Sequence, residues 1–203
     1  MFHTEGTPFM SSTTFYGIQK DTLGVPKVSV VLGEYKNSHL AGPTIWNIMA
    51  KEYSRFGSVP LAEKDSKEFW NSWKNPVMPD WLRIVILSTY DHVYVKRGNW
   101  SRLTEAMNKF TDHYKDNNNH CQAYVEALSN ASEDIIGCCW CITSLSDDPW
   151  RVWNEKTQED EIYDLNIGTK HWELFDTCLD PWKTVSKKTG INAGSVCEEN
   201  SHV

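Results

Sequence analysis

The chain has 203 residues, of which 40% are hydrophobic and 23% are charged, so one soluble globular domain with a substantial core is expected. The formal net charge of −7 argues against broad electrostatic binding to a nucleic-acid backbone, although a local basic pocket is still allowed. No apolar run approaches the length of a membrane span, and the first residues lack the basic-then-apolar layout of a secretory signal. We therefore expect a cytoplasmic protein without a membrane partner.

The 6 cysteines indicate reduced, buried thiols rather than a disulfide framework, because three of them crowd one predicted strand. Cys138 and Cys141 form a C-x-x-C pair, which raises zinc or redox chemistry as an alternative. A strand would point these two thiols to opposite faces, and no second C-x-x-C or His pair completes a set of four ligands. We expect neither a metal nor a cofactor.

The start of the chain is expected to hold a flexible arm and then extended segments. Residues 1–24 are polar and show no sustained period, which predicts a mobile or loosely docked arm, with a single domain over 25–203. Trp46, one of 10 tryptophans, follows a loop between polar segments; a side chain tucked under the loop and one that faces a ligand both stay open. The other elements predicted here are a strand over 27–32, a loop over 37–43 and an extended segment over 52–59.

The middle of the chain mixes predicted helices and strands. A capping pattern formed by Asp65 and Glu68 predicts a helix over 66–74. Residues 101–108, which follow Trp100, fit either a short helix or a loop. The remaining elements predicted from apolar periodicity are strands over 82–87, 92–96 and 109–114, and a second helix over 120–130.

The stretch over 134–175 predicts a hairpin followed by a helix. An apolar strand over 135–143 leads through a turn into a second strand over 150–153. Thr157 and Asp160 match a capping box, so a helix is predicted to follow the hairpin.

Arg151 and Trp153 share one face of that second strand, because alternate side chains of a strand point to opposite sides. An aromatic ring beside a cation suits an aromatic ligand that bears phosphates. The plainer alternative, in which Trp153 is simply buried in the core, stays open.

Three segments, residues 46–59, 68–70 and 134–175, carry a shared pattern of motifs in a shared order, and on these residues the chain resembles the cap-binding translation initiation factor 4E family. In residues 46–59, WNIMAKEYSRFGSV, a Trp precedes a Phe-x-Ser-Val segment at the same separation along the chain as in the family. Glu68-Phe69-Trp70 resembles the family's Asp-Phe-Trp on its first helix, and 134–175 resembles its late hairpin and helix. The resemblance covers about residues 25–190 and depends on element order and spacing.

The resemblance implies an α+β fold, a curved antiparallel β-sheet with about three helices packed on its convex face. In this family the concave face binds the 7-methylguanosine cap of mRNA. Trp46 and Trp100 would stack on the cationic base from both sides, which combines stacking with cation–π attraction. Trp153 corresponds to the family's third Trp, which touches the methyl group.

The chain departs from the family at the charged positions of the cap site. Ser101 stands where the family has the Glu that pairs with the guanine edge, and Glu105 is the nearest carboxylate. Arg151 is the substitute for the family's phosphate-binding cations. Lys156, Lys187 and Lys188 are weaker candidates for phosphate or RNA contacts. These departures indicate a divergent paralogue.

The family's convex face binds initiation factor 4G, or repressors, through a Tyr-x-x-x-x-Leu-hydrophobic helix. By resemblance, the partner-binding residues here are Val25, Pro26, Trp70, Val125 and Glu126. Packing of Trp70 in the core is the alternative for that residue. A 4G-like scaffold or a 4E-binding repressor is the expected protein partner of a monomeric chain.

The leading hypothesis is a non-enzymatic protein that binds the mRNA cap and recruits a 4G-like scaffold for translation initiation. A first alternative is a 4E-like interaction module or translational repressor with weak or no cap binding. A second alternative is an enzyme acting on a nucleotide or thiol substrate, which only the C-x-x-C pair favours.

Overall fold

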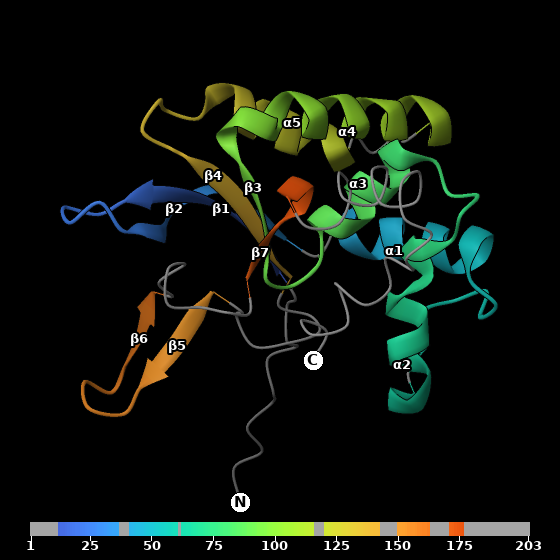
Figure 1. Ribbon diagram of the computed structural model, residues 1–203, viewed down its shortest axis with the longest axis horizontal. Helices are drawn as coiled ribbons and strands as arrows, with labels where there is room; N and C mark the ends of the chain where they lie inside the picture. The colour runs from blue at the N-terminus through green and yellow to red at the C-terminus, as the bar shows by residue number, and fades with distance from the viewer. Residues whose placement is uncertain are drawn as a thin grey trace, which may run out of the picture.

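A five-stranded sheet carrying helices on one face forms the body of the molecule (Figure 1). The computed structural model describes residues 12–36, 41–60, 62–115, 120–142, 150–162 and 171–176. The strand order is β2-β1-β4-β3-β7; all neighbouring pairs are antiparallel except the parallel pair of β3 and β7. The fold is therefore α+β, as the sequence predicts.

The bounds of the elements are as follows. The sheet consists of β1 (Ser12–Lys20), β2 (Pro26–Lys36), β3 (Val93–Lys96), β4 (Gly137–Ile142) and β7 (Trp172–Glu173). A separate hairpin consists of β5 (Arg151–Asn154) and β6 (Glu159–Ile162). The α-helices are α1 (Ala41–Tyr53), α2 (Glu63–Trp70), α3 (Asp80–Ser88), α4 (Trp100–Tyr114) and α5 (His120–Asn130). Two 3₁₀ turns, η1 (Ser72–Lys74) and η2 (Arg97–Asn99), precede α3 and α4.

Strand β1 occupies part of the predicted N-terminal arm. It lies between β2 and β4, with Phe15 fully buried, so the prediction of an arm is wrong for residues 12–20. The turn into β2 is well formed: the Asp21 carboxylate accepts hydrogen bonds from the backbone N–H groups of Leu23 (2.8 Å) and Val25 (2.9 Å). A strand paired on both sides needs little periodicity in its own sequence, because its neighbours supply its backbone hydrogen bonds. Residues 1–11 lie outside the described part of the chain.

Two predicted strands are helical in the structure, and these predictions are wrong: residues 82–87 belong to α3, and residues 109–114 end α4. The extended segment predicted over 52–59 is wrong for its first two residues, which end α1. Short apolar runs do not distinguish a buried strand from a helix buried on all sides, and α3 is buried along nearly its whole length. In contrast, the predicted helix over 120–130 is confirmed by α5.

The late helix predicted from Thr157 and Asp160 does not begin there, because residues 155–158 form a turn and Asp160 lies in β6. Gln158 has a φ of 54°, a left-handed conformation typical of tight turns and not of a helix start. Residues 163–170 lie outside the described part of the chain. The described residues contain five α-helices where about three were expected, and the sheet is not strongly curved.

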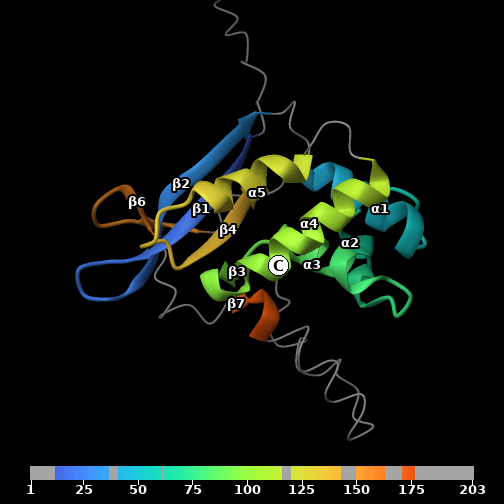
Figure 2. The same cartoon turned by 90° about the horizontal axis from the view of Figure 1, so that it is seen from above.

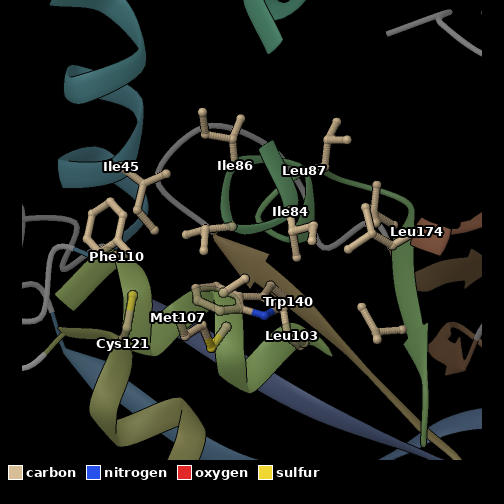
Figure 3. Close-up of a cluster of buried hydrophobic side chains, with 14 of the residues drawn as sticks. Ile45, Ile84, Ile86, Leu87, Leu103, Met107, Phe110, Cys121, Trp140 and Leu174 are labelled. Atoms are coloured by element: carbon tan, nitrogen blue, oxygen red, sulfur yellow. The ribbon is translucent and has the colours of Figure 1, made fainter. Parts of the chain in front are cut away.

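The main core lies between the sheet and the helices. Trp140 of β4 projects into it and is surrounded by α3 and α4 side chains such as Ile84, Leu103 and Met107 (Figure 3). Its ring stacks on Tyr124 of α5 at a centroid distance of 4.0 Å. Figure 2 shows α4 and α5 running side by side along this face of the sheet, with α1, α2 and α3 gathered at one end.

A smaller cluster covers part of the opposite sheet face. It contains Ile18, Val28, Cys139, Cys141 and Trp150, all of them buried. The β5–β6 hairpin follows Trp150 and lies on this side, away from α4 and α5 (Figure 1). The sheet therefore separates two buried clusters, and each cluster is built from residues that are far apart in the sequence.

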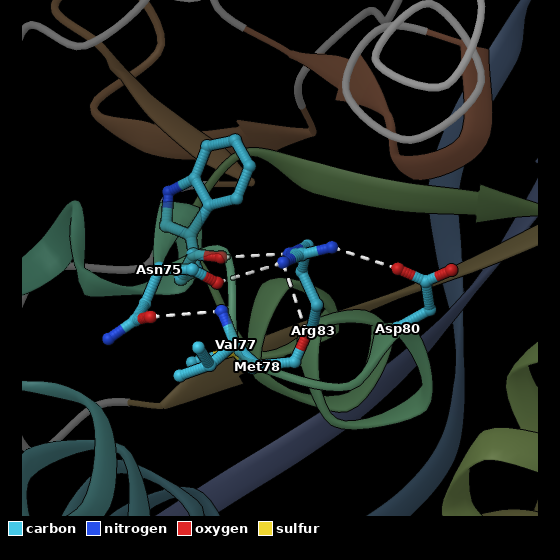
Figure 4. A network of polar contacts seen from close by, with 6 residues as sticks. Asn75, Val77, Met78, Asp80 and Arg83 are labelled. Atoms are coloured by element: carbon cyan, nitrogen blue, oxygen red, sulfur yellow. Dashed lines mark hydrogen bonds and ion pairs between the residues drawn. The ribbon is translucent and has the colours of Figure 1, made fainter. Parts of the chain in front are cut away.

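Arg83 of α3 fixes the segment between α2 and α3 (Figure 4). Its guanidinium is buried and donates hydrogen bonds to the backbone carbonyls of Trp73 (2.9 Å), Asn75 (3.1 Å) and Met78 (3.2 Å). It also pairs with the carboxylate of Asp80 at 2.9 Å. A buried charge with four acceptors satisfies carbonyls that regular secondary structure leaves unpaired.

Candidate functional site

Trp46 lies inside α1 and not in a loop. Its side chain is 5% exposed, and its indole N–H donates a 2.8 Å hydrogen bond to the hydroxyl of Thr89. The rings of Trp46 and Trp70 form an edge-to-face pair, with their centroids 5.3 Å apart. Stacking on a nucleotide base requires an open ring face, and in this structure Trp46 is packed in the core.

Trp100 is also buried, at 8% exposure, as the first residue of α4. Its indole N–H donates to the backbone carbonyl of Val95 at 3.3 Å. The guanidinium carbon of Arg97 lies 4.9 Å from the Trp100 ring centroid, so an internal cation already occupies a cation–π position on this ring. Neither of the two predicted stacking rings therefore offers an open face.

Glu105 lies on the solvent side of α4, whereas Trp100 lies on the core side. The carboxylate of Glu105 accepts a 2.7 Å hydrogen bond from the ammonium of Lys109, one helical turn away. This hydrogen bond and the charge of Lys109 lower the pKa of Glu105. Because residues 100–114 form one continuous helix, the structure does not bring Glu105 and Trp100 together.

Arg151 and Trp153 lie in β5, on the side of the sheet away from α4 (Figure 1). Their side chains lie outside the described part of the chain, but the backbone register is defined: Arg151 pairs with Ile162, and Trp153 pairs with Asp160. Lys156 is exposed in the turn between β5 and β6. Lys187 and Lys188 lie outside the described residues.

The register reveals a carboxylate that the sequence analysis did not place at the site. Asp160 is the direct partner of Trp153 in the antiparallel ladder of the hairpin. Asp160 was interpreted as part of a capping box, which hid its strand position. The turn chemistry of residues 155–158 followed by alternating Glu-Asp-Glu-Ile is the signal that favours a hairpin here.

The predicted partner-binding residues fall into three separate places. Val25 and Pro26 lie at the turn between β1 and β2, Trp70 ends α2 near the opposite end of the molecule, and Val125 and Glu126 lie on α5 (Figures 1 and 2). The structure does not bring these three groups into one surface. Each of them is at least partly accessible to solvent.

Trp70 is held firmly although it is only partly buried. Its ring meets the rings of Trp46 and Tyr90 at nearly right angles, each with a centroid distance of 5.3 Å. Its backbone carbonyl accepts a 2.8 Å hydrogen bond from the Tyr90 hydroxyl. Its neighbour Phe69 is fully buried, as expected for the residue that packs in the core.

The C-x-x-C pair does not assemble a site in this structure. Cys138 belongs to the core on the helical face of the sheet, and Cys141 belongs to the cluster on the other face, as predicted for a strand. Burial raises the pKa of the Cys138 thiol, which disfavours the reactive thiolate. Over the described ranges, no group of three or more His, Cys, Asp or Glu side chains could hold a metal ion.

Among the helices that the structure describes, none combines the length and the apolar character that a bilayer crossing requires. Comparison with family models, with curated proteins and with solved structures gives no match to this chain.

Proposed function

We propose that this chain is a non-enzymatic interaction module that acts in the cytoplasm and binds the cap weakly or not at all. The observation that carries the proposal is the contrast in exposure between three tryptophans. Trp46 and Trp100, which would form the cap sandwich, are buried and hydrogen-bonded inside the protein, whereas Trp70 is partly exposed. A partner can reach Trp70 without any rearrangement of the core.

Trp70 has the properties of an interface anchor. Large aromatic side chains that are held rigid before binding lose little conformational entropy when a partner covers them. Trp46 and Tyr90 hold the Trp70 ring from two sides. The nearby ion pair of Arg55 and Glu68, with 66% and 56% of these side chains exposed, supplies the polar rim that such anchors usually have. By the resemblance to the 4E family, the partner is an amphipathic helix with the Tyr-x-x-x-x-Leu-hydrophobic pattern of scaffolds and repressors.

A labelled peptide with this pattern, titrated with the full chain and followed by fluorescence anisotropy, tests the proposal. Trp70→Ala is expected to weaken binding by about thirtyfold, the lower range for an interface hot spot. Trp81→Ala is the matched control, because Trp81 is also partly buried but packs on His113 and Tyr114 of α4. Equal binding by wild type and Trp70→Ala, or equal losses in both variants, would contradict a Trp70 anchor.

Cap binding at the β5–β6 hairpin is a second candidate, which the register of that hairpin favours. Trp153 would stack on the methylated base, Asp160 would accept hydrogen bonds from the guanine edge, and Arg151 would pair with phosphate. In this candidate the sheet face opposite the helices takes the role of the family's concave face.

Tryptophan-fluorescence titration with 7-methylguanosine triphosphate beside GTP separates the two candidates. Quenching by the methylated nucleotide alone, lost in Trp153→Ala and Asp160→Asn but kept in Trp46→Phe, would favour the hairpin site. If the chain is an interaction module that does not bind the cap, the methylated nucleotide and GTP should have the same effect on the fluorescence.

A further inference from the structure

Two histidine rings and one tryptophan ring meet where the last described segment joins the sheet. Nδ1 of His92 and Nε2 of His171 lie 3.1 Å apart, a direct hydrogen bond between the two rings. The ring centroid of Trp150 lies 4.4 Å from that of His171 and 6.4 Å from that of His92. Trp150 is itself fixed, because it is 1% exposed and its indole N–H donates to the Trp140 carbonyl at 2.7 Å. The cluster therefore joins residues immediately before β3, β5 and β7.

The His92–His171 bond lies at one end of a firmly attached segment, residues 171–176. The backbone N–H of Trp172 donates to the His92 carbonyl at 3.0 Å, and β7 pairs with the edge of β3. Leu174 and Phe175 are buried in the main core. The Glu173 carboxylate accepts hydrogen bonds from four N–H groups, those of the Lys96, Phe175 and Asp176 backbones and of the Asn99 side chain.

His92 adopts a left-handed backbone conformation. Its φ is 65°, which is uncommon for residues other than glycine, although histidine adopts it more often than most. The ring–ring hydrogen bond and the Trp172 contact to the His92 carbonyl are two interactions that hold it. Loss of the ring–ring hydrogen bond is therefore expected to weaken the hydrogen bond from Trp172 to the His92 carbonyl as well.

We propose that the His92–His171 pair is a pH-sensitive clasp that strengthens the attachment of residues 171–176 to the edge of β3 and weakens it on mild acidification. A direct N–H···N bond between two imidazoles requires one ring nitrogen to accept, so at least one ring must be neutral. When both rings are protonated, both facing nitrogens are donors and two positive charges lie side by side. Histidine is the side chain that ordinarily gains its charge on mild acidification, so this is the condition expected to add the second proton.

Charged and titratable groups other than the two histidines also lie on the described elements around the pair. Lys96 of β3 pairs with Asp176, and this partner raises the pKa of Lys96, so it stays cationic. Burial raises the pKa of the Tyr94 hydroxyl, which stays neutral. Asp91 lies beside His92, and the carboxylate of Glu173 is held by its four N–H donors. Protonation of the two histidines is the change that we assign to mild acidification.

The sign of the effect follows from linkage. The attached state disfavours the second proton on the pair, whereas the released segment leaves both rings free to take it. Attachment is therefore strongest at neutral pH and weakens as the pH falls through the range in which free histidine takes up its proton. With one extra proton taken up on release, the population of the released state rises about tenfold for each pH unit below 6.5.

Amide hydrogen exchange of the full chain between pH 7.5 and 5.0, corrected for the intrinsic pH dependence, tests the clasp. The Trp172 amide reports release, and the Cys139 amide in β4 is the internal reference. We expect the protection of Trp172 relative to Cys139 to fall about tenfold between pH 6.5 and 5.5. If the protection of Trp172 relative to Cys139 does not change with pH in the wild type, the proposal is overturned, and no variant is needed to show it.

Two variants assign the effect to the pair. His171→Gln removes one titrating ring, and His92→Asn does the same with a residue that tolerates a positive φ. Both are expected to abolish the pH dependence above pH 5, whereas His113→Gln, on the exposed side of α4, is expected to retain it. Persistence of the full pH dependence in both pair variants would overturn the proposal, because another group would then control release.

Discussion

Replacing Arg83 by methionine should lower the free energy of unfolding by about 3 kcal/mol, a loss expected when buried polar groups lose a charged partner. Methionine keeps most of the apolar volume of the side chain but provides no donor. The carbonyls of Trp73 and Met78, which accept the two buried hydrogen bonds of Arg83, would then be left without their donor.

The magnitude follows from these two bonds. A hydrogen bond to a charged group contributes about 1.5–3 kcal/mol, so the two buried bonds together contribute about 3–6 kcal/mol. Part of this is offset because burial disfavours the charge of Arg83, as its lowered pKa indicates. The bonds to Asn75 and Asp80 are only partly buried, and water can replace them. A net loss of about 3 kcal/mol therefore remains.

Urea denaturation of wild type and variant measures this difference, which should appear as a lower midpoint at an unchanged slope. Arg55→Met is the matched control, because the Arg55 ion pair with Glu68 is exposed and is expected to contribute no more than about 0.5 kcal/mol. A loss below about 1 kcal/mol for Arg83→Met, or equal losses for the two variants, would refute the assigned role of the Arg83 network.

Three further predictions test other parts of the structure. Trp46→Phe removes the hydrogen bond to Thr89 and should cost about 1 kcal/mol in the same denaturation assay, whereas an open Trp46 would give no loss. Cys138 should resist a thiol reagent in the native protein and react only on unfolding, because burial raises its pKa; rapid native labelling at that residue would contradict this. The carboxyl carbon of Asp21 should titrate below the usual 3.8 in an NMR experiment, because the Val25 N–H and then Lys27 favour its charged form. The stabilising contribution of that carboxylate should be complete above pH 3.8 and fade as the pH falls through the lowered native value; a midpoint at or above 3.8 would show that the turn is not held as described.

Local patterns determined several elements correctly. The helix over 120–130 and the strand over 135–143 appear as α5 and β4, because each carries its own period over enough residues. The opposite orientation of Cys138 and Cys141 followed from strand geometry alone. The α+β class, which the resemblance to the 4E family implied, also agrees with the structure.

The predicted site depended on contacts that no local pattern contains. Whether Trp46 faces a ligand or the core is decided by Thr89, which lies 43 residues further along the chain. The exposure of Trp100 is likewise decided by the packing of α4 against the sheet, and its stacking position by Arg97. An amphipathic helix buries whichever aromatic residues fall on its core face, and the sequence around each tryptophan is equally compatible with both outcomes.

Composition, helical and strand periods and the alternation of side chains within each strand are properties that can be read from the sequence of this protein alone. The choice of which apolar runs form helices, such as α3, and of which strands are neighbours, such as β1 and β4, depends on contacts made in the folded chain. The tertiary structure also decided that His92 and His171, 79 residues apart, share a hydrogen bond. The physical reason is that periodicity is a property of neighbouring residues, whereas burial and pairing are properties of the whole chain, set by whichever distant segments exclude water together.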